Sequence, residues 1–240
     1  MQANGSIALV TGANRGLGRA TVEALLARGA AKVYAAARRV ETVQNLAAAD
    51  RRVVPIALDL TDLEQVSRAA KDAVDTTLLI NNGGSLNFAD PLGGDLAAID
   101  VDLRTNFVGT LAMARAFVPV LEENGGGAIV NLLSLVVFGP VPAMGGYSAS
   151  KAAAASVTQS LRAQLADKKI TVHGVFPGAV DTDMIRDFPI PKTSAADVAA
   201  AILDGIAAGE ENIFPDPMAR QGHRAWREDP LAFERQMGSM

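Results

Sequence analysis

Six short apolar runs, rich in β-branched residues, alternate with longer alanine-rich stretches of helical period, and this alternation constrains the fold more than any other feature. The apolar runs cover residues 6–12, 32–37, 52–60, 77–82, 128–134 and 170–177. The helical stretches cover residues 18–29, 61–74, 96–123 and 147–167. Apolar strands joined by crossover helices form a parallel sheet that is covered on both faces. The pattern therefore predicts an α/β, doubly wound fold.

Length and composition indicate one domain and argue against a nucleic-acid partner. A chain of 240 residues can form one large, well-packed domain, and no repeat or low-complexity linker divides it. With 49% hydrophobic and 20% charged residues the composition is globular, and a net charge of −4 disfavours a nucleic-acid-binding surface. We expect residues 1–240 to form a single domain. The proline-punctuated, charged segment at about 215–240 is expected to be a C-terminal extension on the surface or on a partner subunit.

Several localisation and ligand signals are absent from the chain. No cysteine occurs, which excludes disulfides, thiol nucleophiles and zinc–thiolate sites. The first residues lack the basic and long apolar regions of a secretory signal, and no apolar run approaches the ~20 residues that span a bilayer. We expect a cytoplasmic protein with no metal site and no membrane partner.

The segment TGANRGLG, from Thr11 to Gly18, follows the first predicted strand and opens the first predicted helix. In this position Gly12 permits a tight turn, whereas Gly16 and Gly18 allow the backbone to approach a pyrophosphate. The N-terminal end of a helix favours the negative charge of that group. A generic strand-to-helix turn is the alternative, but three glycines in register favour a dinucleotide-binding Rossmann fold.

The segment YSASK places Tyr147, one of two tyrosines in the chain, four residues before Lys151. Residues i and i+4 share a helix face, so both side chains can point into one cleft. A phenol has a reference pKa of about 10, and a nearby ammonium group together with a positive nicotinamide ring favours the phenolate. We therefore expect the pKa of Tyr147 to fall toward neutrality, with Tyr147 as the proton donor and Lys151 as the residue that lowers its pKa. A helix aromatic beside a solvated charge is the alternative.

These two segments and several others, in the same order, resemble those of the short-chain dehydrogenase/reductase family. The spacing Thr-Gly-x-x-x-Gly-x-Gly of the glycine turn is typical of that family. The further marks are Asp59-Leu60, the NNGG segment at 81–84, Asn106, Ser134, the YSASK segment and the PGAVDT segment at 177–182. The resemblance covers about residues 6–209. It departs at Gly83, where the family usually has alanine, and at Leu133, where another serine often stands.

The resemblance implies a role for each of these positions. Ser134 would hydrogen-bond the substrate carbonyl oxygen and stabilise the charge that develops there. Lys151 would also hold the nicotinamide ribose, and Asn106 would hold a water that resupplies protons. The implied catalytic residues are Asn106, Ser134, Tyr147 and Lys151. The implied cofactor-binding residues are Gly12, Asn14, Arg15, Gly16, Leu17, Gly18, Arg38, Asp59, Leu60, Asn82, Gly83, Tyr147, Lys151, Pro177, Gly178, Val180 and Thr182.

Cofactor preference depends on the adenosine ribose, where NADP carries a 2′-phosphate and NAD a free hydroxyl. An NAD enzyme of this type needs an acidic residue at the end of the second strand, but this strand ends in Ala37-Arg38-Arg39. Arg38 offers a planar, permanently charged guanidinium that suits phosphate, and Arg15 can reach the same phosphate from the glycine turn. Solvated surface charges are the alternative. The sequence predicts NADP(H) as the cofactor.

The expected reaction is the NADPH-dependent reduction of a ketone or aldehyde to an alcohol, or its reverse, as in carbonyl reductases and alcohol dehydrogenases. The predicted wall of the substrate pocket is apolar, which favours hydrophobic carbonyl compounds over sugars or acyl-carrier thioesters. Its residues are Leu86, Leu135, Val136, Met144 and Met184.

Two other functions are open on the same scaffold. A catalytically silent NADP-binding regulator would usually lack the tyrosine or the lysine of YSASK, and this chain has both. A non-redox enzyme that resembles halohydrin dehalogenases would lack the glycines and carry arginine in place of Lys151.

Members of the family assemble through two long middle helices, and the stretches 96–123 and 147–167 are rich in alanine and valine. We expect a homotetramer, with a dimer as the alternative.

Overall fold

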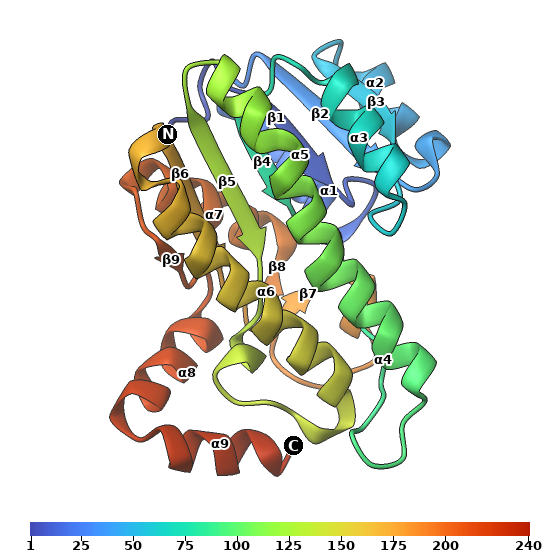
Figure 1. Ribbon diagram of the computed structural model, residues 1–240. Coiled ribbons are helices and arrows are strands. Elements are labelled where there is room, and N and C mark those ends of the chain that lie inside the picture. The colour runs from blue at the N-terminus through green and yellow to red at the C-terminus, as the bar shows by residue number, and fades with distance from the viewer.

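A sheet of seven parallel strands, in the order β3-β2-β1-β4-β5-β6-β9, forms the centre of the computed structural model, which describes all 240 residues (Figure 1). The strands are β1 (Ile7–Thr11), β2 (Lys32–Ala37), β3 (Val53–Ala57), β4 (Leu78–Asn81), β5 (Gly127–Leu132), β6 (Ile170–Val175) and β9 (Asn212–Ile213). A separate pair joins β7 (Val180–Asp181) to β8 (Thr193–Ser194). The strand order reverses between β1 and β4. The six predicted strands and the doubly wound fold are therefore confirmed.

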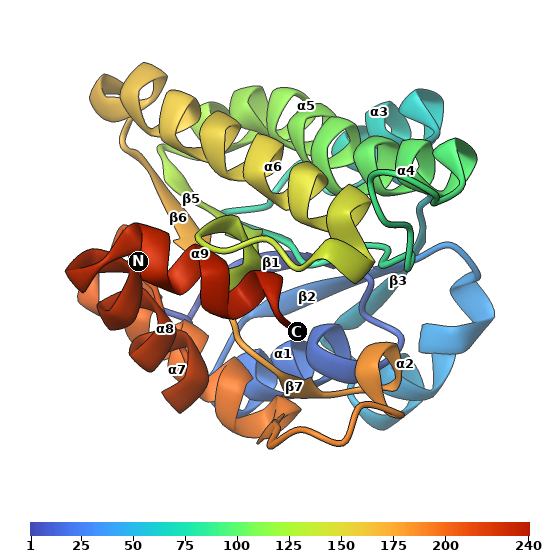
Figure 2. The ribbon, with the colours of Figure 1, turned by 90° about the horizontal axis from the view of Figure 1, so that it is seen from below.

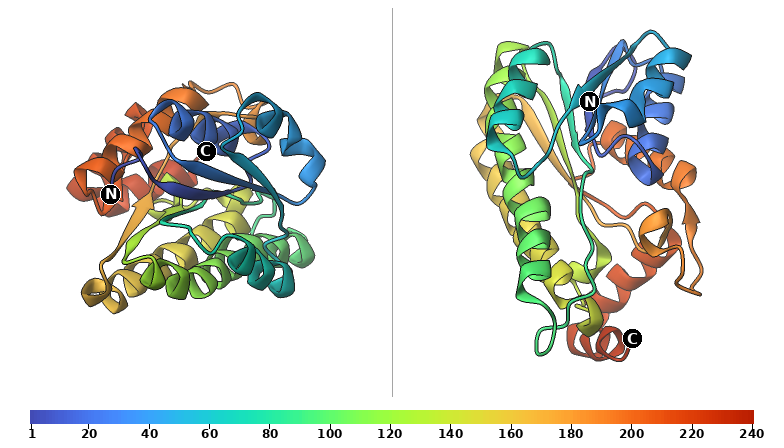
Figure 3. Two further views of the ribbon diagram at one scale, coloured as in Figure 1. Left: turned by 90° about the horizontal axis from the view of Figure 1, so that it is seen from above. Right: turned by 90° about the vertical axis from the view of Figure 1, so that its right-hand side faces the viewer.

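Helices cover both faces of the sheet (Figure 3). One face carries α1 (Gly16–Ala27), α2 (Gln44–Ala49) and α7 (Ala195–Ala208), and the other carries α3 (Leu63–Asp72), α5 (Thr110–Glu123) and α6 (Gly145–Gln164). Successive side chains of a strand point to opposite faces, so a strand that is apolar throughout buries both. In β1, Ala8 and Val10 belong to the buried cluster on the α1 face, and Leu9 belongs to the cluster on the α5 face.

The helical stretch predicted at 96–123 contains a local irregularity in the structure. It consists of α4 (Leu96–Asp102), a π-helical stretch (Leu103–Gly109) and α5. Such π-helical turns are rare and frequently lie at functional sites. This one contains Asn106, so the irregularity sets the position of a predicted catalytic residue.

The segment expected to be a C-terminal extension forms two helices, α8 (Pro217–Glu228) and α9 (Pro230–Gly238), which pack on the segment between β5 and α6 (Figure 2). Phe233 and Met237 of α9 are buried together with Leu135 and Val141 of the same chain. The sequence interpretation did not identify these helices, nor α2, α7 and the edge strand β9. No helix is at once long enough and apolar enough to cross a membrane.

Candidate active site

Three of the predicted catalytic residues meet beyond the carboxyl ends of β4 and β5, at the edge of a parallel sheet where ligands commonly bind. Tyr147 lies in the first turn of α6, and Ser134 follows β5 directly. The Ser134 hydroxyl lies close enough to Tyr147 to lower the pKa of its phenol by hydrogen bonding. Lys151, one turn further along α6, is buried, and its Nζ lies 5.7 Å from the centre of the Tyr147 ring. Lys151 Nζ also donates to the carbonyl oxygen of Leu132, at 2.6 Å.

Asn106, the fourth predicted catalytic residue, is buried beside Lys151. Its Nδ2 donates to the carbonyl oxygen of Ser85 at 2.8 Å and to Ser150 Oγ at 2.9 Å. Its Oδ1 accepts from the backbone N–H of Ser85 at 2.9 Å. A Cβ atom at Gly84 would lie 2.9 Å from Asn106 Oδ1 and 3.6 Å from Lys151 Nζ. The structure thus places all four predicted catalytic residues in one cluster.

The electrostatics of this cluster differ from the prediction. Burial raises the pKa of Tyr147 to about 12, although the hydrogen bond with Ser134 lowers it, and the charge of Asp102 raises it further. Burial lowers the pKa of Lys151 to about 8, and the charge of Asp102 opposes that fall. In the protein without cofactor the pKa of Tyr147 therefore lies above its ordinary value, and Lys151 is not among the groups that lower it. Burial of the phenol by the fold disfavours the phenolate, and the extent of that burial cannot be predicted from the order of residues.

The glycine turn has the geometry that a dinucleotide requires. Gly12 and Gly16 have φ values of +66° and +51°, in the left-handed region that favours glycine. A Cβ atom at Gly18 would lie 2.2 Å from the carbonyl oxygen of Gly12, so no side chain fits there. No side chain caps the N-terminus of α1, and its first turn has no acidic residue. Its backbone N–H groups are therefore suited to bind the pyrophosphate of a dinucleotide.

Two further segments predicted to bind the cofactor lie against this turn. Asn82 Nδ2 donates to the carbonyl oxygen of Thr11 at 2.9 Å, and the N–H of Gly83 donates to Thr11 Oγ1 at 2.8 Å. A Cβ atom at Gly83 would lie 2.9 Å from Leu60 Cδ1. A Cβ atom at Gly16 would lie 3.1 Å from Cγ2 of Thr182, so the segment after β6 also reaches this turn. Residues from four distant parts of the chain therefore surround one site.

The remaining residues predicted to bind the cofactor flank these contacts. Asp59 accepts from the N–H and the hydroxyl of Thr61, and Leu17 packs on the core. Gly178 donates its N–H to Asp216 Oδ2 at 2.8 Å. The side chains of three further predicted residues form no hydrogen bond: Asn14, Pro177 and Val180. The backbone carbonyl of Pro177 accepts a hydrogen bond from the N–H of Leu135, and Val180 pairs with Thr193 in the short sheet.

The two arginines predicted to recognise a 2′-phosphate are both exposed. Arg38 follows β2 directly and takes part in none of the nine ion pairs. The side chain of Arg15 is 62% exposed and lies 3.6 Å from a carboxylate oxygen of Asp183. The strand β2 ends at Ala37, so no acidic residue stands where an NAD enzyme of this type needs one.

The predicted substrate wall divides into a buried part and an exposed part. Leu135 is buried, and a Cβ atom at Gly222 of α8 would lie 2.7 Å from Leu135 Cδ2. Val136 and Met144 are partly buried against the same C-terminal helices. Leu86 is half-buried, whereas Met184 is 40% exposed. The helices α8 and α9, which the sequence interpretation missed, therefore support this wall.

An aromatic pair joins the two loops beside this wall. The rings of Phe88, after β4, and Phe188, after β7, stack with their centres 5.3 Å apart.

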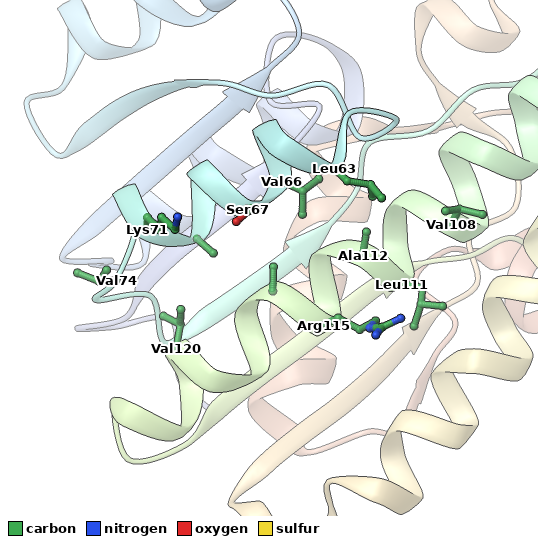
Figure 4. Close-up of a pocket in the computed structure, with 12 residues that line it drawn as sticks. Leu63, Val66, Ser67, Lys71, Val74, Val108, Leu111, Ala112, Arg115 and Val120 are labelled. Atoms are coloured by element: carbon green, nitrogen blue, oxygen red, sulfur yellow. The ribbon is translucent and has the colours of Figure 1, made fainter.

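A groove of about 710 Å³ lies between α3 and α5, away from the catalytic cluster, and contains none of the predicted site residues (Figure 4). It is lined mainly by apolar side chains such as Leu63, Val108 and Leu111. No group of three or more His, Asp or Glu residues is arranged to hold a metal ion.

Comparison with known proteins gives consistent similarities over most of the chain. The profile of the family described as short chain dehydrogenase matches residues 6–191. A dehydrogenase/reductase SDR family protein 7-like from Anopheles gambiae is 31% identical over 245 residues, which cover 90% of this chain and 76% of that protein. An uncharacterised oxidoreductase of Staphylococcus aureus is 32% identical over 206 residues, which cover 82% and 89%.

Two solved structures share the whole architecture. A short chain dehydrogenase from Burkholderia cenocepacia, in complex with NADP, is 42% identical with a TM-score of 0.94 and 99% of each chain covered. A short chain dehydrogenase/reductase from Burkholderia phymatum, in complex with NAD, is 25% identical with a TM-score of 0.87, covering 97% of this chain and 96% of that one. The matched regions include both the glycine turn and the cluster around Tyr147.

Proposed function

The chain belongs to the short-chain dehydrogenase/reductase family of oxidoreductases, and from that premise we propose that it reduces a ketone or aldehyde to an alcohol with NADPH. The observation that carries the proposal is the cluster of Ser134, Tyr147 and Lys151. It brings the hydroxyl groups of Ser134 and Tyr147 together with a buried lysine at the edge of the sheet next to the glycine turn. A catalytically silent binding protein has no need of this arrangement.

In the proposed reaction a bound reduced nicotinamide supplies the hydride that the carbonyl carbon accepts. Tyr147 donates its phenolic proton to the carbonyl oxygen, which completes the alcohol. Ser134 donates a hydrogen bond to the same oxygen and stabilises the negative charge that develops there. The ammonium group of Lys151 stabilises the phenolate that remains. We assign to Asn106, which anchors the π-helical turn, the role of holding the water that returns a proton to the site.

We propose NADP(H) as the preferred cofactor. The glycine turn would hold the pyrophosphate, and Arg38 with Arg15 would bind the 2′-phosphate. Two observations support this choice: Arg38 has no ion-pair partner, and a structure that is 42% identical is a complex with NADP. The NAD complex at 25% identity shows that the scaffold also accepts the other cofactor, so the preference depends on these arginines.

The substrate class that fits is a hydrophobic carbonyl compound. Four large apolar side chains on the loops beside the catalytic cluster are exposed: Phe88 by 52%, Leu92 by 100%, Met184 by 40% and Phe188 by 37%. Exposed apolar surface of this kind marks binding regions in proteins.

We further propose that the protein forms a homotetramer built on α5 and α6, with a dimer as the alternative, and that it acts in the cytoplasm. Light scattering that gave only the monomer mass of 24.9 kDa would contradict both assemblies.

The decisive experiment follows nicotinamide absorbance with NADPH, and separately NADH, and a panel of aliphatic and aromatic ketones and aldehydes. We expect carbonyl-dependent oxidation of NADPH by the wild type and at most about a hundredth of that rate by Tyr147→Phe. If the wild type binds NADPH but oxidises it with no carbonyl compound of the panel, the proposed reaction is wrong and the catalytically silent regulator is favoured.

A further inference from the structure

Asp102, the last residue of α4, is a fully buried carboxylate that the sequence interpretation did not identify. Its exposure is 0%, and it takes part in none of the protein's nine ion pairs. It accepts hydrogen bonds from Ser85 Oγ at 2.7 Å, from the N–H of Asn87 at 3.1 Å and from Asn87 Nδ2 at 2.9 Å. A buried carboxylate without an adjacent cation is unfavourable unless its oxygens are satisfied, as they are here.

A chain of hydrogen bonds leads from this carboxylate to the catalytic tyrosine. Ser85, which donates to Asp102, also exchanges two backbone hydrogen bonds with the side chain of Asn106, at 2.9 and 2.8 Å. Asn106 in turn donates to Ser150 Oγ at 2.9 Å, and Ser150 Oγ donates to the carbonyl oxygen of Tyr147 at 2.7 Å. Asp102 therefore fixes the loop after β4 on one side and, through Asn106, the first turn of α6 on the other.

The charge of Asp102 also acts on both titrating groups of the cluster. Burial is the main cause of the raised pKa of Tyr147, and the Asp102 charge adds to it. Burial is likewise the main cause of the lowered pKa of Lys151, and the Asp102 charge works against it. In both cases the negative charge favours the protonated form, because a proton is harder to remove next to an anion.

The other charged groups of this region have separate partners. On α4 itself, Asp100 pairs with Arg104 at the surface. In the loop before α4, Asp90 accepts from two backbone N–H groups of its own turn, and Asp95 caps α4. The π-helical turn and the loop after β4 present the neutral side chains of Asn106, Ser85 and Asn87 to the carboxylate, and the titrating groups of α6 are Tyr147 and Lys151.

We propose that Asp102 is a positioning residue: its buried carboxylate fixes the loop after β4 against the first turn of α6 through Ser85 and Asn106, and its negative charge acts on the pair formed by Tyr147 and Lys151. This inference rests on the proposed function, since a protonated tyrosine beside a lysine ammonium is the state that donates a proton to a carbonyl oxygen. The carboxylate thereby favours the protonated tyrosine that reduction requires, and it extends the pH range in which Tyr147 can donate a proton toward higher pH.

The test is a spectroscopic titration of Tyr147 in the protein without cofactor. The only other tyrosine is Tyr34, so the variant Tyr34→Phe leaves Tyr147 as the sole phenol. In that background Asp102→Asn is compared with Asp100→Asn, the surface carboxylate of the same helix. We expect the phenolate absorbance of the Asp102→Asn protein to appear at a pH lower by about half a unit or more. Asp100→Asn should leave the titration unchanged, with circular dichroism confirming the fold over the same range.

A purely structural role predicts a different pattern. In that case Asp102→Asn would lower thermal stability without moving the titration, and that result would overturn the proposal. Ser85→Ala removes a hydrogen bond but keeps the charge, so it should cost stability and leave the titration in place. If Asp102→Asn does not fold, Asp102→Ser, which leaves room for a water molecule, takes its place. Failure of both variants to fold would also overturn the proposal, because it would make the residue a requirement of the fold.

Activity adds a second measurement that separates this inference from the proposed function. With a carbonyl substrate, the alkaline limb of the pH profile of kcat/KM should move to lower pH in Asp102→Asn and stay in place in Asp100→Asn. If no carbonyl compound is reduced, the proposed reaction fails, yet the titration still decides whether Asp102 controls the protonation of Tyr147.

Discussion

The glycine turn and the catalytic cluster lie at the same edge of the sheet, but they are built by different means. The turn is a backbone structure: two glycines have positive φ, and a third packs against a carbonyl oxygen. The cluster consists of buried and half-buried side chains from α4, the π-helical stretch, α6 and the loops after β4 and β5, held by hydrogen bonds between them. A backbone site fails when a side chain is added, whereas a side-chain site fails when one functional group is removed.

The contrast extends to electrostatics. In the glycine turn the binding groups are N–H dipoles at the start of α1, which do not titrate and do not depend on burial for their charge. In the cluster, burial moves the pKa of Tyr147 to about 12 and that of Lys151 to about 8, so the chemistry depends on how closely the fold encloses them. Changes at the two sites should therefore separate cofactor binding from turnover.

The largest expected effect is on turnover at the cluster. Tyr147→Phe removes only the hydroxyl that donates the proton, so kcat should fall by about 10²- to 10⁴-fold, the usual contribution of general acid catalysis. Cofactor binding, measured by fluorescence titration with NADPH, should stay within a few-fold of the wild type. Retention of more than about a hundredth of the wild-type kcat would remove Tyr147 from its assigned role.

The corresponding change in the turn is Gly18→Ala. The added Cβ would lie 2.2 Å from the carbonyl oxygen of Gly12, and since that atom belongs to the backbone, the turn has to open. A backbone distortion of about 3 kcal/mol corresponds to about a hundredfold loss of cofactor affinity. Calorimetric titration with NADPH measures it. Gly238→Ala is the matched control, because no atom lies within 4 Å of a Cβ at that position, and it should bind as the wild type does.

The same contrast explains how much the sequence could predict. The glycine turn is a local motif, so eight consecutive residues were enough to predict its structure, and the six buried strands followed from their apolar runs. The cluster was predicted only where a family motif marks it, at Ser134, Tyr147, Lys151 and Asn106. Asp102 and its partner Ser85 were missed because they are 17 positions apart and meet only in the folded chain.

The missed C-terminal helices did have a local signal. Both α8 and α9 begin with Asp-Pro, where the aspartate side chain accepts from a backbone N–H of the first turn and the proline occupies the first helical position. The prolines at 217 and 230 were interpreted as interruptions, although each marks a helix start. The π-helical stretch and the raised pKa of Tyr147 had no such signal, because both result from tertiary packing.

A smaller effect is expected on cofactor choice, which tests the two arginines beside the glycine turn. Arg38→Asp removes a charge-assisted hydrogen bond to phosphate, worth roughly 1.5–3 kcal/mol, and introduces an acceptor for a ribose hydroxyl. The KM for NADPH should rise by about one to two orders of magnitude, and kcat/KM with NADH should improve relative to NADPH. Arg39→Asp changes the neighbouring exposed arginine and should have a weaker effect. A wild-type kcat/KM that is equal or higher with NADH would contradict the assignment of Arg15 and Arg38.

The smallest expected effect is on stability, and it concerns Lys151. Burial lowers its pKa from 10.5 to about 8, so below pH 8 the fold encloses a charged amine that the unfolded chain would expose to water. That difference of about 2.5 units corresponds to about 3 kcal/mol of lost stability. Lys151→Met removes this loss but leaves the carbonyl oxygen of Leu132 without its donor, which costs about 1–3 kcal/mol. The variant should therefore be inactive and yet more stable at pH 7, by about 1 kcal/mol.

The pH dependence of that difference identifies its cause. The wild type gains stability as the pH rises from about 8 to 10.5, because the folded protein releases the proton of Lys151 before the unfolded chain does. The variant lacks this gain, so its advantage in the free energy of unfolding, measured with urea without cofactor, should vanish about one pH unit above 8 and reverse over the rest of that range. Titrating groups outside the cluster contribute equally to both proteins and cancel in the difference. A difference that stayed constant from pH 7 to 10.5 would mean that Lys151 titrates as an exposed lysine does, and that the enclosed cluster does not set its charge.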